Sequence, residues 1–194
     1  MNPANPTPEL PPTPRQIETW LSQAGSTWDD KTGAISMPIY QVATFRHPAL
    51  GQSTGFDYSR TANPTRSVLE ETVARLDGGV RAFAFGSGLA AVDTVLRLFA
   101  PGDRIVVTED LYGGTFRLFE KGYRALGIEA VYVDTSDTAA VERALASNRA
   151  RALFVETPTN PLLKVADLAA LGELARRHNA LLIVDNTFLT PALS

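Results

Sequence analysis

Cysteine is absent from this sequence of 194 residues, and histidine occurs only twice, as His47 and His178. Without cysteine the chain can form no disulfide, no thiolate metal site and no cysteine nucleophile. Two histidines are too few to favour a histidine-built metal centre, so we expect no bound metal. A chain without disulfides suits a reducing compartment, and we predict a cytoplasmic protein.

Charge and hydropathy argue against two further classes of partner. The 18 basic and 21 acidic side chains leave a net charge of -3, which favours neither nucleic acid nor a membrane surface. No apolar run approaches the roughly 20 residues that span a bilayer. Residues 1–14 are rich in proline and lack the basic start and apolar core of a secretory signal, so they are predicted to form a flexible arm.

The first third of the sequence shows little periodicity apart from one short helix. Thr13 and Pro14 suit the start of that helix, and Gly25 suits its end. Residues 26–62 are dense in glycine, serine, threonine and aromatic residues, which predicts a long loop with one short strand near 39–44. Long irregular segments are usually functional or packed on a partner.

From Asn63 onward the pattern becomes regular. Asn63 and Pro64 open a predicted helix that closes at Gly78. Strands are then predicted at 81–85, 104–108, 128–133, 151–156 and 180–184, alternating with helices at 89–99, 114–126, 138–147 and 168–178. The runs 105–107, 153–155 and 181–184 are wholly apolar, as in strands buried on both faces. The sequence therefore predicts an α/β fold with a mostly parallel sheet covered by helices.

Polar residues collect where the predicted strands end, which is where open α/β sheets bind ligands. Gly86, Ser87 and Gly88 open a helix, and such small residues let backbone N–H groups approach a phosphate. The alternative there is a tight strand-to-helix turn. Asp185 ends an apolar strand, where a carboxylate needs a partner. That partner is either the protonated ring nitrogen of a pyridine cofactor or the neighbouring backbone.

Three other residues each admit two interpretations. Tyr112, next to a helix start, is either a half-buried packing aromatic or a ring stacked on a flat cofactor, with a phenol that transfers protons. Asn160 lies between two prolines and is either a turn residue or a ligand. Arg60, in the long loop, is either solvated or a bidentate phosphate ligand.

Five motifs in order resemble the Cys/Met-metabolism enzymes that use pyridoxal 5'-phosphate (PLP). This family includes cystathionine γ-synthase, cystathionine γ-lyase and β-lyase, methionine γ-lyase and O-acetylhomoserine sulfhydrylase. The resemblance covers nearly everything from Gly33 onward. The motifs are Phe56-Asp57-Tyr58-Ser59-Arg60-Thr61 with Asn63-Pro64-Thr65, Phe85-Gly86-Ser87-Gly88-Leu89-Ala90-Ala91, Asp110-Leu111-Tyr112-Gly113-Gly114-Thr115, Glu156-Thr157-Pro158-Thr159-Asn160-Pro161 and Val184-Asp185-Asn186-Thr187-Phe188.

The resemblance implies a fold, a cofactor and a phosphate site. The fold is the three-layer, mostly parallel α/β fold of type I PLP-dependent transferases, which is aspartate aminotransferase-like. By resemblance, Tyr58 and Arg60 reach across a subunit interface to the neighbour's phosphate. Ser87, Gly88 and Leu89 are implied to cradle the phosphate, the last two through backbone N–H groups. The family usually has methionine where this chain has Leu89, a swap of similar volume that a backbone contact tolerates.

The resemblance also implies the residues around the cofactor ring. Tyr112 would stack on the ring and transfer protons, and Asp185 would pair with the pyridine nitrogen, which makes these two the expected catalytic residues. Asn160 would contact the phenolic oxygen, with Glu156 as its support, and Thr187 would lie close to the ring.

One departure from the family pattern concerns lysine. The family attaches PLP to a lysine in a Ser-x-Thr-Lys segment beyond the position of Asp185, and this sequence ends at Ser194 without such a segment. Its lysines are Lys31, Lys121 and Lys164, all expected at the surface. We therefore expect a truncated PLP-binding domain, with 1–62 as an arm and loop segment that packs on a neighbouring subunit and 63–194 as the first part of the large domain.

The resemblance implies β- or γ-elimination or replacement on sulfur amino acids or O-acyl-homoserine, with cystathionine γ-synthase-like activity preferred. Cystathionine β- or γ-lyase is the alternative. The implied assembly is a homotetramer of catalytic dimers, with an amino acid as substrate. Two other hypotheses remain open. One is a non-catalytic fragment or partner subunit. The other is a nucleotide-binding Rossmann-like domain, which the glycine pattern disfavours.

Overall fold

The computed structural model describes residues 14–24, 29, 32–146 and 150–193. Residues 1–13 of the predicted arm, which include the capping residue Thr13, lie outside these residues, as do the predicted helix end Gly25 and Lys31. Pro14, the last residue of the predicted arm, instead begins a helix. The chain divides into two compact units, residues 1–84 and 85–194, and each is described by itself. The sequence analysis divides the chain differently, into an arm and loop segment (1–62) and the first part of the large domain (63–194). That division assigns functions to the two parts, and it stays a prediction.

The first unit contains the two helices that the sequence predicts. Helix α1 covers Pro14–Gln23 and helix α2 covers Pro64–Leu76. The side chain of Asn63 accepts a hydrogen bond from the N–H of Thr65 at 2.9 Å, so the predicted cap of α2 is confirmed. The guanidinium of Arg75 lies 5.0 Å from the ring centre of Trp20, a cation–π contact that joins the two helices.

Two strands predicted in the first unit or at its end do not form. At 39–44 the described residues show only an isolated bridge between Thr44 and Tyr58. The backbone of Tyr40 instead bonds side chains at the start of α2, its N–H to Thr65 at 2.9 Å and its carbonyl to Asn63 at 3.0 Å. In the stretch 81–85 the N–H of Ala84 donates to Glu70 at 3.0 Å. Side chains thus take backbone groups that a strand would offer to a neighbouring strand.

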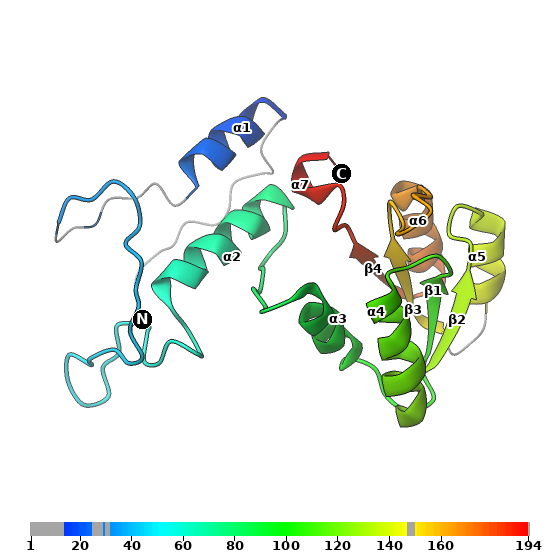
Figure 1. Ribbon diagram of the computed structural model, residues 1–194, viewed down its shortest axis with the longest axis horizontal. Helices are drawn as coiled ribbons and strands as arrows, with labels where there is room; N and C mark the ends of the chain where they lie inside the picture. Colours follow the sequence, from blue (N-terminus) through cyan, green and yellow to red (C-terminus); the bar gives the residue numbers. More distant parts are fainter. Residues whose placement is uncertain (1–13, 25–28, 30–31, 147–149, 194) are drawn as a thin grey trace. The chain divides into compact units, whose positions relative to one another are not determined.

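The second unit is built on a four-stranded sheet. Its strands are β1 (Arg104–Thr108), β2 (Glu129–Val133), β3 (Ala150–Glu156) and β4 (Leu181–Asp185). They lie in the order β2-β1-β3-β4, and every pairing is parallel (Figure 1). The predicted parallel sheet is therefore confirmed. Its register places Glu156 and Asp185, the last residues of β3 and β4, side by side.

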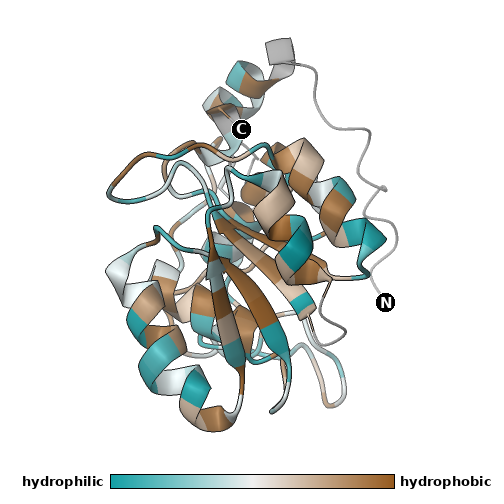
Figure 2. Cartoon of the chain, turned by 90° about the vertical axis from the view of Figure 1, so that its right-hand side faces the viewer, coloured by the Kyte–Doolittle hydropathy of each residue, from teal (hydrophilic) through white to brown (hydrophobic). Residues whose placement is uncertain are grey.

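Helices cover both faces of this sheet and give a three-layer arrangement. On one face lie α3 (Gly88–Leu96) and the helical stretch that starts with α4 (Gly113–Arg117). On the other lie α5 (Thr138–Leu145) and α6 (Leu168–Arg177). Alternate strand residues feed two separate cores, and Figure 2 shows the hydrophobic strands between the helices. In the first core, Phe119 packs edge-on against Phe154 with ring centres 5.8 Å apart.

One strand is less buried than its apolar sequence predicts. In β1 and β3 nearly every residue is buried, as expected. In β4, however, Leu181 is 54% exposed and Val184 is 36% exposed. No side chain of β4 is fully buried, so the expectation that this strand is buried on both faces is wrong. Within the described residues β4 lies at the edge of the sheet.

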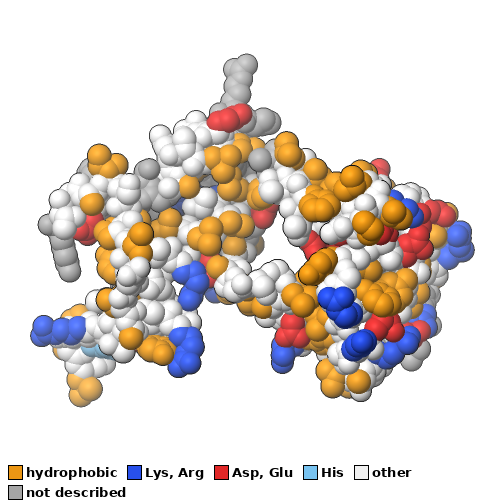
Figure 3. Space-filling view, in the orientation of Figure 1, with side chains coloured by type: hydrophobic (Ala, Val, Ile, Leu, Met, Phe, Trp, Pro, Cys, Tyr) orange, Lys and Arg blue, Asp and Glu red, His pale blue; other side chains and the backbone are white. Residues whose placement is uncertain are grey.

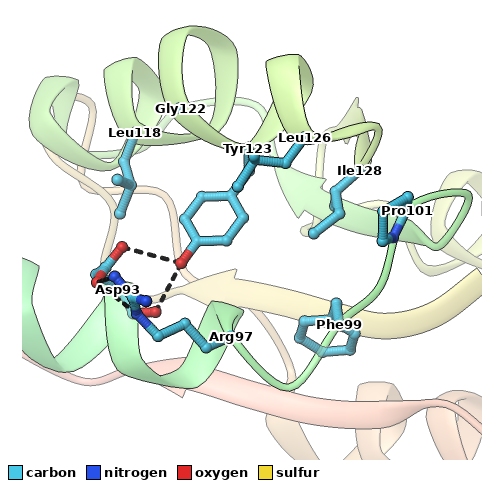
Figure 4. A pocket seen from close by; sticks show the side chains of 9 residues that line it. All are labelled: Asp93, Arg97, Phe99, Pro101, Leu118, Gly122, Tyr123, Leu126 and Ile128. Carbon is cyan, nitrogen blue, oxygen red and sulfur yellow. Dashed lines mark hydrogen bonds and ion pairs between the residues drawn. The ribbon is translucent and has the colours of Figure 1, made fainter.

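The helix predicted at 114–126 forms, but its geometry changes along its length. After α4 the backbone passes through a π-helical turn, η1 (Leu118–Tyr123), and a 3-10 turn, η2 (Arg124–Leu126). The π turn carries Tyr123, whose hydroxyl donates to the backbone carbonyl of Asp93 at 2.8 Å. This contact crosses a hollow of about 560 Å³ between α3 and the helical stretch (Figure 4). None of the expected site residues lines this hollow.

After β4 the second unit contains one further short helix, α7 (Thr190–Leu193), which the sequence did not predict. Within the described ranges, no helix combines the length and apolar character needed to cross a bilayer. On the face of the second unit visible in Figure 3, acidic and basic side chains lie interspersed.

Candidate functional site

A buried carboxylate organises the carboxyl ends of the strands. The side chain of Glu156, 5% exposed, follows the last apolar residues of β3. One oxygen accepts the N–H of Tyr112 at 2.8 Å, and the other accepts the N–H of Asn160 at 2.9 Å. A single side chain therefore joins the loop after β1 to the loop after β3.

The surroundings of Glu156 raise its pKa. Burial is the main cause, and the negative charges of Asp185 and Asp110 add to it. The two backbone N–H donors act in the opposite direction because they stabilise the carboxylate. The N–H of Glu156 itself donates to the buried hydroxyl of Thr108 at 3.2 Å, which fixes the end of β3 against β1.

Asp185 lies beside Glu156 at the end of β4. Its oxygen Oδ1 accepts hydrogen bonds from the N–H and the hydroxyl of Thr187, the N–H at 3.2 Å. The backbone-bonding interpretation of Asp185 thus holds for this one oxygen. Among the described residues the other oxygen, Oδ2, accepts no hydrogen bond, so it is available to an N–H donor from a ligand.

The next residue adds a second unfilled acceptor. The amide nitrogen of Asn186 donates to the carbonyl of Thr190 at 3.2 Å, whereas its amide oxygen is shielded from solvent and has no partner in the described part of the chain. Buried polar atoms are nearly always satisfied. In the described residues, the amide oxygen of Asn186 is therefore a buried acceptor for which no protein donor is present.

Tyr112 stands at the start of α4, with its side chain 51% exposed. Its ring lies directly over Gly114. A Cβ atom built on Gly114 would approach ring carbon Cε1 of Tyr112 to 2.4 Å, well inside van der Waals contact. Glycine at 114 therefore permits the ring position, a role that the sequence analysis missed although Gly114 belongs to the same motif.

Asn160 is placed by the loop that follows β3. Its N–H is fixed by Glu156, while its side chain is exposed. The carboxylate of Asp110 accepts the hydroxyl of Thr159 and the N–H of Leu162, the latter at 3.1 Å. Asp110 thus ties this loop to the loop after β1. The sequence analysis did not select it, although it opens the motif that contains Tyr112.

The predicted phosphate cradle forms the start of α3. The Ser87 hydroxyl accepts the N–H of Ala90 at 3.2 Å and caps the helix. The first N–H groups of a helix have no carbonyl one turn earlier, so those of Gly88 and Leu89 are available to an anion. A Cβ added at Gly88 would meet nothing within 4 Å, which leaves open space at this position.

The structure brings only some of the expected residues together. Hydrogen bonds and strand register join one group, which we call the strand-end site: Tyr112, Glu156, Asn160, Asp185 and Thr187. Ser87, Gly88 and Leu89 lie in the same unit without a hydrogen bond to that group among the described residues. Tyr58 and Arg60 belong to the first unit, where the Arg60 guanidinium lies 4.9 Å from the ring centre of Tyr58.

Lys164 is engaged by two carboxylates. Its ammonium group lies 3.0 Å from Glu109 and 2.7 Å from Asp134, which joins the ends of β1 and β2 to the loop after β3. Hydrogen bonds to Asp134 and Glu109 raise the pKa of Lys164. The same contact with Lys164, helped by Ser136, lowers the pKa of Asp134 to about 2. Lys121 is exposed on η1.

We expect the Lys164–Asp134 pair to make part of the free energy of unfolding depend on pH in the acidic range. An acid whose pKa is lowered on folding stabilises the fold above its unfolded pKa and loses that contribution as pH falls. The loss attributable to Asp134 should fall between pH 3.8, its ordinary pKa, and about 2. Urea unfolding across this range should show the loss in the unmodified chain and a shallower dependence in Asp134→Asn. Equal slopes in the two chains would contradict the assignment.

The parallel sheet and its helical layers define the second unit as a three-layer α/β domain, a class that binds ligands at the carboxyl ends of its strands. The family model described as Cys/Met metabolism PLP-dependent enzyme matches residues 18–194. The chain belongs to this family, whose members depend on PLP.

Known relatives agree with this membership. The chain is 51% identical over 174 residues to cystathionine gamma-lyase of Bacillus subtilis (strain 168), covering 90% of this chain and 46% of the relative. It is 49% identical over 179 residues to cystathionine gamma-synthase of Haemophilus influenzae, covering 92% and 48%. The crystal structure of cystathionine gamma-lyase from Lactobacillus plantarum, complexed with L-serine, matches with a TM-score of 0.84 and 48% identity, covering 90% of this chain and 45% of that one.

These comparisons confirm the predicted fold, which is the α/β fold of the PLP-dependent cystathionine synthases and lyases. The chain spans about half the length of the relatives that it matches.

Proposed function

We propose that this chain forms part of the cofactor site of a PLP-dependent transsulfuration enzyme. The reaction is β- or γ-elimination or replacement on sulfur amino acids or O-acyl-homoserine, and cystathionine γ-synthase-like activity is our first choice. The observation that supports this most is the buried carboxylate of Glu156, which holds Tyr112 and Asn160 beside Asp185 at the strand ends. All four residues lie in motifs shared with the family.

The residues present fit PLP. A phosphate needs N–H donors, which the start of α3 offers at Gly88 and Leu89, next to the Ser87 hydroxyl. A protonated pyridine nitrogen needs an acceptor, and Asp185 has an oxygen, Oδ2, without a partner among the described residues. When bound, PLP supplies an electron-accepting ring next to the substrate amino group. Tyr58 and Arg60 would complete the phosphate site of a neighbouring subunit in a homotetramer of dimers.

The side chains of the strand-end site would divide the remaining tasks. Asp185 would hold the ring nitrogen protonated through Oδ2, and Thr187 fixes the orientation of that carboxylate. Asn160 donates its side-chain amide to the phenolic oxygen of the cofactor. The half-exposed ring of Tyr112 would contact the flat face of the cofactor, and its hydroxyl would take up or deliver a proton at the substrate. Glu156 would contact neither the cofactor nor the substrate. Its role is to hold the loop after β1 and the loop after β3 together.

A second candidate, a cystathionine lyase, is favoured by the 51% identity to a gamma-lyase and the 47% identity to a beta-lyase of Lactococcus lactis. Product analysis of the PLP-loaded protein separates the possibilities. Cystathionine formed from O-acyl-homoserine and cysteine supports the synthase. Pyruvate and homocysteine formed from cystathionine support a β-lyase, and 2-oxobutyrate and cysteine support a γ-lyase. If the PLP-loaded protein forms none of these products, that result contradicts the proposed class of enzyme.

A non-catalytic fragment or partner subunit is the third candidate, and the environment of Lys164 favours it. With its amine held by Glu109 and Asp134, Lys164 is poorly suited to attach PLP covalently. We expect borohydride treatment of these 194 residues with PLP, followed by peptide mass mapping, to give only scattered labelling. A stoichiometric adduct at Lys31, Lys121 or Lys164 would show that one of these lysines attaches the cofactor.

A further inference from the structure

The segment of residues 58–62, which we call the Arg60 turn, is closely held within the first unit. The N–H groups of Thr61 and Ala62 both donate to the carbonyl of Tyr58 at 3.0 Å, which closes the turn. The N–H of Ser59 donates to the carbonyl of Ala43 at 2.9 Å and fixes the turn to the preceding loop. Arg60 is exposed on this turn, with its guanidinium over the Tyr58 ring.

A second arginine, Arg66, holds the backbone on both sides of Arg60. From the first turn of α2, its Nη1 donates to the carbonyl of Ser59 at 3.3 Å and its Nη2 to the carbonyl of Thr61 at 2.7 Å. One planar group therefore spans the two carbonyls that flank Arg60. The turn has little freedom to move while both bonds are in place.

Arg66 is itself held by Glu70. The Nε of Arg66 lies 3.3 Å from an oxygen of Glu70, one helical turn along α2, and the two side chains are 32% and 24% exposed. The same oxygen of Glu70 accepts the N–H of Ala84 at 3.0 Å. With Nε, Nη1 and Nη2 all engaged within the unit, Arg66 keeps its fork turned toward the carbonyls of the Arg60 turn rather than toward a ligand.

We propose that Arg66, oriented by Glu70, is a positioning residue that presents Arg60 and Tyr58 to a phosphate group. This rests on the proposed function, in which those two residues bind the phosphate of PLP. A guanidinium suits the task because its fixed fork reaches two carbonyls at once, whereas a lysine ammonium is a point charge. Because arginine binds phosphate through a planar, bidentate geometry, a disordered Arg60 would bind it less well.

The test compares Arg66→Met and Arg66→Lys with the unmodified chain, and uses Arg75→Lys on the same helix as the matched control. We expect Arg66→Met to weaken PLP binding about tenfold, the equivalent of one unit in log Kd. Arg66→Lys should recover part of that loss, and Arg75→Lys should change little. Binding of pyridoxal, which lacks the phosphate, should be unchanged in all variants. A purely structural role would weaken PLP and pyridoxal alike, and that result would overturn the proposal.

A second readout is independent of PLP. In ¹⁵N relaxation of the chain, the order parameters of residues 59–61 should be near the rigid value of about 0.85 and fall below about 0.6 in Arg66→Met. Unchanged order parameters would overturn the proposal. If the unmodified chain binds PLP and pyridoxal equally, the phosphate role of Arg60 fails, and the relaxation data still decide what Arg66 does. If Arg66→Met does not fold, Glu70→Gln replaces it, with a smaller loss of order expected in the same turn.

Discussion

Replacing Glu156 by glutamine is expected to lower the free energy of unfolding by about 1–3 kcal/mol, the usual cost of leaving a buried donor unsatisfied. Glutamine keeps one carbonyl oxygen but places an NH₂ group where the second oxygen was. Either the N–H of Tyr112 or that of Asn160 then faces another donor. The two loops should separate, and PLP binding should weaken together with stability. Urea unfolding and a PLP titration measure the two effects.

Glu173→Gln is the matched control, since Glu173 is an exposed glutamate whose ion pair among the described residues is with Arg176, one turn along α6. It should change the free energy of unfolding by less than about 0.5 kcal/mol, as surface substitutions usually do. If Glu156→Gln were equally mild, the carboxylate would not be holding the loops.

The pH dependence of the same variant has a defined sign. An acid whose pKa is raised on folding binds its proton more tightly in the folded state, so stability falls as pH rises through the interval between the two pKa values. For Glu156 this interval begins at 4.5, its ordinary pKa, and extends upward to the raised value. As pH rises through this interval, the free energy of unfolding of the unmodified chain should fall. Glu156→Gln should not show this part of the pH dependence. The sign is opposite to that expected for Asp134.

Adding one methyl group at Gly114 is expected to displace the ring of Tyr112. The new Cβ atom would lie 2.4 Å from ring carbon Cε1, so the half-exposed ring must move. Stability should change by only about 1 kcal/mol, because alanine favours the helix by about that amount over glycine. If Tyr112 transfers the proton as proposed, a displacement of about 1 Å should lower kcat/KM about 100-fold. Urea unfolding of the PLP-loaded protein should show the small change in stability, and steady-state kinetics should show the large loss of kcat/KM.

Gly113→Ala provides the control for that experiment. It adds the same methyl group one residue earlier in α4, where a Cβ atom would meet only the end of the Arg117 side chain at an ordinary 3.6 Å. It should gain the same helix propensity without moving the tyrosine. If the two variants had equal kcat/KM, the position of the Tyr112 ring would not control the reaction.

Local chemistry explains which parts of the fold were predictable. The start of α2 follows from capping between near neighbours in the sequence, and the predicted cap at Asn63 forms. The sequence predicts a helix opening near Ser87, and the structure adds that the Ser87 hydroxyl caps it. The apolar runs of β1 and β3 identified buried strands because the alternation with helices requires cover on both faces of the sheet. The candidate residues were found through motifs, and the roles assigned to them stay predictions.

Tertiary structure decided the features that depend on distant partners. In the stretches near 39–44 and at 81–85, where strands were predicted, side chains of α2 and of its cap Asn63 bond the backbone instead. The exposure of β4 depends on its place in the strand order. The contacts of Glu156 with Tyr112, and of Asp110 with Leu162, join residues more than forty positions apart.

The sequence by itself determined most of the alternating α/β elements, the cap of α2 at Asn63 and the residue types available to a phosphate and a pyridine ring. Only the tertiary structure decided which of these residues meet, because a parallel sheet brings together strand ends that are far apart in the chain. It also decided which neighbours Glu156, Gly114 and Arg66 contact. Their contacts are hydrogen bonds and close approaches that no spacing in the sequence encodes.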